Sequence, residues 1–269
     1  MENDYLIQKK PFNALVLFSL PIIVGNLFQQ TYTMADSAIV GRFVSEQALA
    51  AVGASYSLTN IFICVAIGGG IGSSVVVSRY FGAHHYKKMC TAIFTALIAF
   101  LAISILLGGV GLLLSEQIMT ALNTPADVLD MAIDYLNIYF LGLPFLFMYN
   151  VLSAMFNALG KSKIPLYFLI FSSLFNIALD WILVTQFQMG VTGVAWATLI
   201  AQSISAVLSF GVLLRLLSSI SRENDGIFSF REIPAMVKIA LPSILQQSTV
   251  SIGMMLVQSV VNSFGSEAL

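Results

Sequence analysis

Long apolar stretches separated by short polar segments recur along the whole chain. About 20 apolar residues are enough for a helix to cross the hydrocarbon core of a bilayer. Seven windows nearly free of charge meet this length, around Phe12–Val40, Ala50–Val77, Thr91–Leu114, Tyr135–Leu159, Pro165–Val184, Val194–Leu214 and Val237–Val261. Polar and glycine residues at 186–193 divide the fifth window from the sixth, which predicts a tight turn there. The pattern therefore predicts seven transmembrane helices.

Composition strengthens this prediction and excludes soluble classes of protein. Hydrophobic residues make up 58% of the chain and charged residues 9%, against about 25% charged in a soluble domain. The mean hydropathy is +0.90. We therefore predict an all-α, polytopic membrane protein, a helical bundle, and exclude a soluble enzyme. We further expect no enzymatic activity, no cofactor and no nucleic-acid partner.

The few charges are sorted between the two sets of predicted loops. One set carries the basic residues Lys9, Lys10, Arg79, Lys87, Lys88, Lys161, Lys163, Arg215, Arg222, Arg231 and Lys238. The other set has only Arg42 as a cation and carries Glu46, Glu116, Asp127, Asp130 and Asp134. Because cytoplasmic loops are enriched in Lys and Arg, we expect a cytoplasmic N-terminus in a multi-pass protein of the plasma membrane.

Two carboxylates lie inside stretches apolar enough to cross the bilayer. Asp36 is the only charged residue between Lys10 and Arg42, and Asp180 is the only one between Lys163 and Arg215. A charge at membrane depth costs about 2.5–3.5 kcal/mol on insertion scales. Both aspartates are therefore candidates for holding a cation or a proton.

Other polar residues share helix faces with these aspartates, because residues three or four apart stack on one side of a helix. They are Ser172 and Asn176 with Asp180, Thr198 with Gln202, Gln29, Tyr32 and Thr33 with Asp36, and Tyr135 with Tyr139. If these faces converge, their oxygens suit a hard cation such as Na⁺. The same burial favours the protonated form of a carboxyl group, which suits proton binding. Interhelical hydrogen bonding alone is the alternative role for the uncharged residues.

Proline and glycine residues inside the spans predict two further features. Pro21 and Pro144 each remove a helical hydrogen bond. A bend at Pro21 could let the first helix switch shape as Asp36 changes charge, or it could be a static kink. Gly68-Gly-Gly-Ile-Gly72 has the spacing of a close contact between helices.

The seventh span resembles the first. Phe12 to Leu20-Pro21 aligns with Ile233 to Leu241-Pro242, and Ser45-Glu46-Gln-Ala-Leu49 aligns with Ser266-Glu267-Ala-Leu269. Chance similarity between apolar segments is the alternative to a true repeat. A parallel repeat predicts one six-helix lobe and the first helix of a truncated second lobe. The expected parts are a cytoplasmic N-terminus at 1–11, a lobe at 12–214, a cytoplasmic linker at 215–232 and the seventh helix at 233–269.

Several motifs together resemble the multidrug and toxic compound extrusion (MATE) family. Leu20-Pro21 with Met34-Ala-Asp36-Ser-Ala-Ile-Val-Gly41-Arg42 is similar to the signature of that family's first helix. The further matches are Arg79-Tyr-Phe-Gly82-Ala83, Asn157-Ala-Leu-Gly160-Lys-Ser-Lys-Ile-Pro165, Asn176-Ile-Ala-Leu-Asp180-Trp-Ile-Leu and Gly190-Val-Thr-Gly193-Val-Ala-Trp-Ala-Thr198. They span nearly the whole chain.

The resemblance implies a monomeric twelve-helix antiporter with two lobes around a central cleft, which exports cationic lipophilic drugs in exchange for Na⁺ or H⁺. It places Asp36, Asn176, Asp180 and Thr198 at the coupling-cation positions, where Na⁺ is the candidate metal. Candidate cavity-lining residues are Gln29, Tyr32, Thr33, Tyr135, Tyr139, Asn157 and Gln202, with a helix bend at Pro21. Trp181 departs from the family, which often has proline there, and contacts from a second lobe cannot be named.

Three other classes of protein could also use two buried aspartates. A flippase for lipid-linked oligosaccharides on a related fold would line its cavity with arginine, and no Arg or Lys lies inside a predicted span here. An intramembrane aspartyl protease would carry Tyr-Asp and Gly-x-Gly-Asp motifs, but Ala35 and Leu179 precede the two aspartates. An ion channel is disfavoured by the paired lobes, which indicate alternating access.

Overall fold

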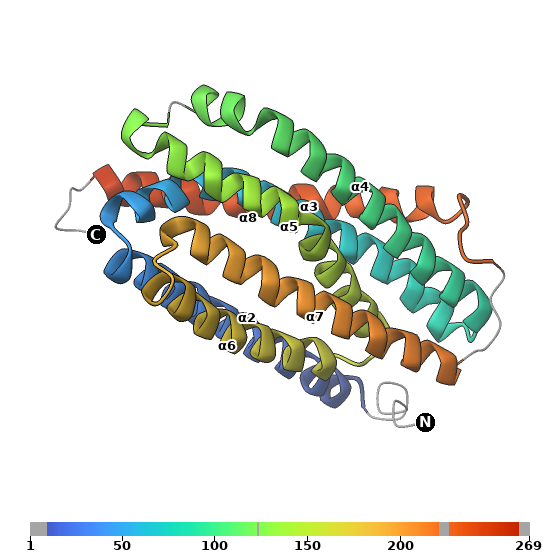
Figure 1. Cartoon of the computed structure of the whole chain (residues 1–269). Helices are drawn as coiled ribbons and strands as arrows, with labels where there is room; N and C mark the ends of the chain where they lie inside the picture. The colour runs from blue at the N-terminus through green and yellow to red at the C-terminus, as the bar shows by residue number, and fades with distance from the viewer. Residues whose placement is uncertain (1–9, 123, 221–225, 264–269) are drawn as a thin grey trace.

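The computed structural model describes residues 10–122, 124–220 and 226–263, and these residues form an elongated bundle of helices without strands (Figure 1). The helices are α2 (Pro11–Phe43), α3 (Glu46–Gly82), α4 (Tyr86–Ala121), α5 (Ala126–Ala158), α6 (Lys163–Thr185), α7 (Gly190–Ile220) and α8 (Ile233–Ser263). The predicted all-α class and the seven predicted helices are confirmed. The segments expected at residues 1–9 and 266–269, and the basic residue Arg222, lie outside the described residues.

Six of the described helices, α2 to α7, are long and apolar enough to cross a membrane by length and composition. The seventh span, in α8, stays a prediction. The helices extend beyond the apolar windows because a helix ends at caps and turns rather than at the first charge. The Ser45 hydroxyl, for example, accepts a hydrogen bond from the Ala48 N–H at 3.0 Å and so caps α3 directly after α2.

The tight turn predicted between the fifth and sixth spans is confirmed. Gln188 and Gly190 have positive φ angles of 52° and 59°, and the Met189 N–H donates to the Leu183 carbonyl at 3.1 Å. Residues in the left-handed conformation let the chain reverse its direction within a short segment, and glycine adopts this conformation without steric cost. The turn leads α6 into α7 and holds the two helices side by side.

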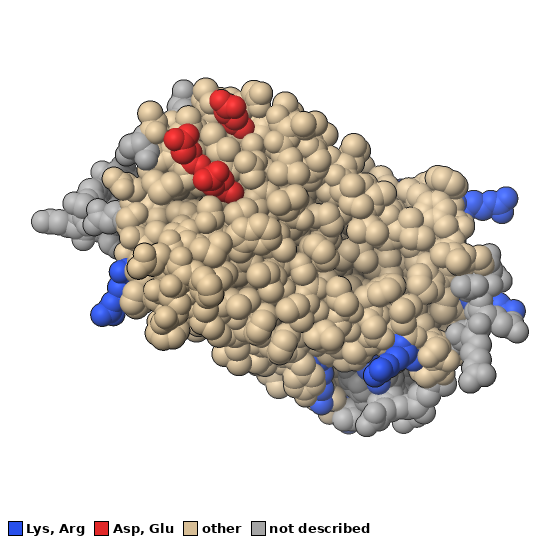
Figure 2. Space-filling model, viewed as in Figure 1, with Lys and Arg blue, Asp and Glu red and all other residues tan. Residues whose placement is uncertain are grey.

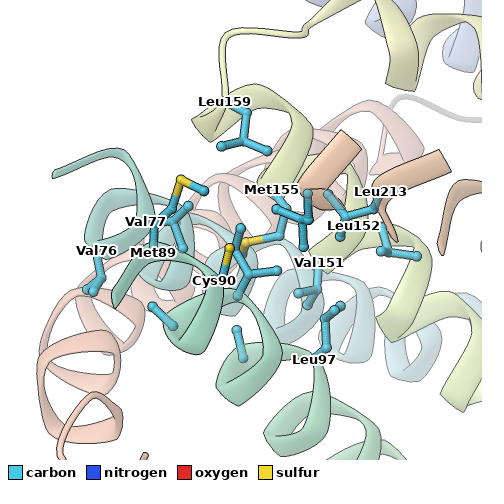
Figure 3. Close-up of a cluster of buried hydrophobic side chains, with 14 of the residues drawn as sticks. Val76, Val77, Met89, Cys90, Leu97, Val151, Leu152, Met155, Leu159 and Leu213 are labelled. Atoms are coloured by element: carbon cyan, nitrogen blue, oxygen red, sulfur yellow. The ribbon is translucent and has the colours of Figure 1, made fainter. Parts of the chain in front are cut away.

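Helix α5 lies at the centre of the packing, where it contacts α3, α4 and α7. At one end of the bundle these four helices enclose the largest apolar core (Figure 3). Its labelled members are Val76, Val77, Met89, Cys90, Leu97, Val151, Leu152, Met155, Leu159 and Leu213. Helix α6 packs on α7, and α2 packs mainly on α6. Helices α2 and α6, which carry Asp36 and Asp180, are therefore neighbours.

Close contact at the glycine-rich segment of α3 is confirmed, and its partner is α8. A Cβ atom added to Gly72 would lie 2.6 Å from the Ala240 backbone nitrogen, and one added to Gly68 would lie 2.6 Å from the Ile244 backbone nitrogen. Because the glycines have no side chain, the two backbones approach each other directly. Helix α8 also has a proline, Pro242, inside it, as α2 has Pro21.

Charged side chains lie at the two ends of the bundle, and the surface between the ends that Figure 2 shows has none. The end formed by the α3–α4, α5–α6 and α7–α8 connections is basic, and the red side chains lie at the opposite end. This separation fits the sorted charges of the sequence. Helix α7 continues to Ile220, so the segment between α7 and α8 runs from 221 to 232.

We predict that Gly72→Ala destabilises the protein, because the new methyl group has to displace α8 backbone. Overpacking of this kind costs about 1–3 kcal/mol. The measurement is the thermal unfolding midpoint of the purified protein in detergent. Gly109→Ala in α4 is the matched control, since a Cβ there meets nothing within 4 Å. Equal midpoints for both variants would contradict the close α3–α8 contact.

Candidate cation site between α2, α6 and α7

One face of α6 carries a buried amide and a buried carboxyl group. Ser173, Asn176 and Asp180 are buried in α6, and Asn176 and Asp180 are only 2% and 0% exposed. Residues four apart lie one above the other on a helix, so the amide and the carboxyl group point in the same direction. This face meets α2 on one side and α7 on the other.

Asp36 reaches the same place from α2. The carboxyl groups of Asp36 and Asp180 lie close enough to interact directly, so that a single proton could be shared between them. Oδ1 of Asp36 and Oδ1 of Asp180 are buried and accept no hydrogen bond from the described residues. Two carboxylates so close cannot both keep a full charge in a buried place unless a cation or a shared proton lies with them. Sequence spacing did not predict this contact, because it joins two helices far apart in the chain.

Asn176 connects the carboxyl pair to the neighbouring helices. In one amide orientation, its Nδ2 donates to the Thr198 hydroxyl at 3.3 Å. The reverse orientation makes more hydrogen bonds: the amide nitrogen donates to Asp180 Oδ2 at 2.8 Å and to the Tyr32 hydroxyl at 2.9 Å, and the amide oxygen accepts from the Thr198 N–H at 3.0 Å. The amide orientation is assigned by this network, which favours the reverse one.

Three tyrosines and a threonine surround the pair. The Tyr32 hydroxyl lies beside Thr198 and close to both aspartates. Tyr135 on α5 also interacts with both aspartates, and Tyr139 interacts with Tyr135. The Tyr139 hydroxyl donates to the Thr59 carbonyl of α3 at 3.1 Å. The structure therefore brings Asp36, Asn176, Asp180 and Thr198 together, with Tyr32 and Tyr135 beside them. That they bind a coupling cation stays a prediction.

Two clefts open beside this cluster, and Thr198 and Gln202 line both of them. One is lined by Gln29, Tyr32, Tyr149, Leu169, Ser172, Ser173, Asn176, Thr198, Ala201 and Gln202. The other is lined by Tyr135, Ile138, Tyr139, Gly142, Leu146, Ala195, Thr198, Leu199 and Gln202. Both walls combine polar and apolar groups.

Tyr149 is a cleft residue that the sequence analysis missed. The signal was available, because Tyr135, Gly142 and Tyr149 repeat at the spacing that returns to one face of a helix every two turns. We had followed that face from Tyr135 to Tyr139 only. Ser173 was also missed. It directly follows Ser172, and the spacing of residues along the helix did not show that both serines face the cleft.

Three predicted residues lie outside the cluster. Thr33 is exposed, and its hydroxyl donates to the Gln29 carbonyl of its own helix at 3.0 Å. Asn157 lies near the carboxyl end of α5 and lines neither cleft, although its Oδ1 is buried and accepts no hydrogen bond from the described residues. Pro21 is buried within α2, which runs through it as a single helix.

The oxygen atoms of the site fit a hard cation better than a transition metal. No group of three or more His, Cys, Asp and Glu side chains occurs among the described residues. Two carboxyl groups, an amide, a threonine and a phenol meet here instead, and oxygen ligands of this kind suit Na⁺.

Comparison with known proteins agrees with this architecture. The chain is 32% identical over 263 residues to the probable multidrug resistance protein YpnP of Bacillus subtilis, covering 97% of this chain and 59% of that protein. It is 29% identical over 212 residues to the multidrug export protein MepA of Staphylococcus aureus, covering 78% of this chain and 46% of that protein. The chain thus spans about half the length of these relatives.

A solved structure shares the fold. A multidrug resistance MATE family transporter in an outward-facing conformation superposes with a TM-score of 0.89 at 24% identity, covering 99% of this chain and 59% of that one. The MatE family model matches residues 21–182, the region that contains both aspartates. Since this match covers more than half of the chain, the chain belongs to the MATE (MatE) family, whose members are membrane transporters and not enzymes.

Proposed function

We propose that the protein is a secondary multidrug exporter that expels cationic lipophilic compounds in exchange for Na⁺ or H⁺. The observation that carries this proposal is the close pair of Asp36, which is half-buried, and Asp180, which is buried, between helices that are apolar enough to span a membrane. The relatives named for multidrug resistance and export support the substrate class.

The coupling step follows from the charge of the carboxyl pair. A proton shared by the two groups, or a Na⁺ ion held by their oxygens, neutralises charge that the buried site cannot leave exposed. Asn176 and Thr198 hold Asp180 and Tyr32 in place, so the pair stays organised when the cation leaves. Na⁺ and H⁺ compete in this scheme because they use the same oxygens.

Cation binding is linked to drug binding because both concern α2. Gln29 and Tyr32 of α2 line a cleft next to the carboxyl pair, two turns and one turn from Asp36 respectively. Binding of a cation at Asp36 from the outside shifts α2, with Pro21 as its bending point, and weakens the cleft's hold on the drug. The linkage is reciprocal for binding, so a bound drug favours release of the cation.

An inward cation flow supplies enough free energy for this exchange. One charge that crosses 100 mV yields about 2.3 kcal/mol. One pH unit across the membrane yields about 1.4 kcal/mol per proton. The basic end of the bundle is the cytoplasmic end in this proposal, as the distribution of Lys and Arg predicts.

The competing functions lack support in the site. A flippase would need basic side chains around a pyrophosphate, and neither cleft is lined by Lys or Arg. A protease would use its two aspartates on a water molecule, but a family of transporters offers no such activity.

We predict that Asp36→Asn abolishes ion-driven efflux while the protein remains inserted. Asparagine keeps the shape of the side chain but removes the charge that the cation neutralises. Loss of one coupled charge at 100 mV corresponds to a drug gradient about fiftyfold smaller. The measurement is drug transport in everted vesicles under separately imposed Na⁺ and pH gradients.

Asp130→Asn is the matched control for this experiment, because Asp130 is exposed near the start of α5. It should transport as the wild type does. Wild-type transport by the Asp36→Asn variant under both gradients would exclude the proposed coupling site. The gradient that drives the wild type identifies the ion.

We predict that Asn176→Leu removes most of the stabilisation that the coupling ion provides. The variant leaves Asp180 Oδ2 and the Tyr32 hydroxyl without the amide, which costs about 1–3 kcal/mol, and the bound ion loses a ligand. The measurement is the unfolding midpoint in NaCl against choline chloride, and at acidic against alkaline pH.

Thr33→Val is the control, because the Thr33 hydroxyl bonds only to its own helix in the described structure. It should respond to the ion as the wild type does. A ligand at one hundred times its Kd stabilises by about 2.7 kcal/mol, so the difference is measurable. An unchanged ion response in Asn176→Leu would remove Asn176 from the site.

A further inference from the structure

A hydrogen-bonded segment lies at the basic end of the bundle, in the connection between α7 and α8. Residues Gly226–Glu232, which we call the strap, are held by three hydrogen-bonded positions. The Thr91 hydroxyl donates to the Gly226 carbonyl at 2.8 Å, and the Ser229 N–H donates to the Thr95 hydroxyl at 3.0 Å. The Tyr80 hydroxyl donates to the Glu232 carboxylate, 3.1 Å from each oxygen.

The strap lies beside the start of the apolar window predicted at Thr91–Leu114 in α4, not beyond the end of that helix. Lys87 and Lys88 occupy the first turn of α4, and Thr95 follows about 10 Å further along the helix at 1.5 Å per residue. Thr91 and Thr95 are 5% and 0% exposed. A backbone segment at this depth needs partners for its N–H and C=O groups because water is scarce. The two threonine hydroxyls provide such partners.

The side of the strap that faces away from α4 is apolar. Ile227 is 63% exposed and Phe230 is 79% exposed, and the Phe228 and Phe230 rings meet edge to face at 4.7 Å. Connecting loops normally carry polar side chains on the outside. Exposed aromatic and aliphatic side chains at the depth of the first span residues are typical of a membrane interface.

Basic side chains flank this apolar side. Arg231 and Lys88 are exposed next to the strap and at the start of α4. Among the described residues of this end of the bundle, Glu232 is the only carboxylate, and Tyr80 binds it. Long basic side chains can extend their charged ends to the headgroups while the apolar residues lie deeper.

We propose that the strap is a binding surface for anionic phospholipids of the adjacent leaflet. Ile227 and Phe230 insert at the boundary between headgroups and acyl chains, and Arg231 with Lys88 binds the phosphate groups. The threonine and tyrosine hydrogen bonds hold the strap at the depth where both contacts form. Since the strap leads into α8, bound lipid anchors the start of that helix. This proposal needs the bundle to lie in a membrane but does not depend on the exporter function.

The test uses a tryptophan as a depth probe at the strap. Phe230→Trp is introduced into protein whose Trp181 and Trp196 are replaced by Phe, and the protein is placed in vesicles of phosphatidylcholine and phosphatidylglycerol. We expect a blue-shifted emission, with greater loss of fluorescence from lipid brominated near the headgroup than from lipid brominated near the bilayer centre. Brominated phosphatidylglycerol should quench more than brominated phosphatidylcholine at equal mole fraction.

A second variant tests the basic residues. Arg231→Gln with Lys88→Gln should abolish the preference for phosphatidylglycerol, since each basic residue near an anionic surface contributes about 1 kcal/mol, or about fivefold. The matched control is Glu116→Gln at the opposite end of the bundle, which should keep that preference.

Three outcomes would overturn the proposal. Emission typical of water would place the strap outside the membrane interface. Equal quenching by the two brominated lipids would remove the anionic preference. A blue-shifted emission that neither lipid quenches would mean that protein, such as a second copy of this chain, covers the strap.

Discussion

Neutralisation of two carboxyl groups in one buried place is the constraint on which the rest of the structure depends. The carboxyl groups of Asp36 and Asp180 lie next to each other between helices that otherwise carry almost no charge in their spans. Neither side chain can reach water-rich surroundings as freely as a surface carboxylate can, so their charge has to be met by a proton or a cation. Asn176, Thr198 and Tyr32 are arranged around this requirement, and their hydrogen bonds hold the pair in one geometry.

The two aspartates lie on helices that are packed to different extents, since α6 is held on two sides and α2 mainly on one. Asp180 lies on α6, which packs against α7 and α2, and it is fully buried. Asp36 lies on α2, which packs mainly on α6 and exposes large apolar side chains along most of its length. A change of charge at the pair therefore acts on a helix with few other contacts to break. Helix α8 is held in two other ways. Gly68 and Gly72 bring the α3 backbone into contact with it, and the hydrogen bonds of the strap connect its start to α3 and α4.

The helices and several of their contacts could be predicted from the sequence, because a chain that crosses a bilayer must do so as long apolar helices. Apolar windows long enough to span predicted the seven helices, since a backbone in lipid must satisfy its own hydrogen bonds. The glycines of 68–72 predicted a close contact, and the polar residues at 186–193 predicted the turn that Gln188 and Gly190 form. Their isolation in apolar windows singled out Asp36 and Asp180, and helical spacing grouped Asn176 with Asp180 and Thr198 with Gln202. Resemblance to a family then placed Asp36, Asn176, Asp180 and Thr198 at one site. These predictions depend on local periodicity or on motifs, both of which a single chain displays.

Contacts between distant helices were decided only by the tertiary structure. Periodicity could not tell that α8 is the partner of Gly68 and Gly72, that Tyr149 lines the cleft, or that Thr33 and Asn157 stay outside it. A helical face is known from the spacing of its residues, but its rotation toward a neighbour depends on packing along both helices. The strap shows the same limit, because Thr91 and Thr95 look like ordinary span residues until the fold places a backbone segment against them. The sequence determined which side chains were available, and the packing of the helices determined which of them meet.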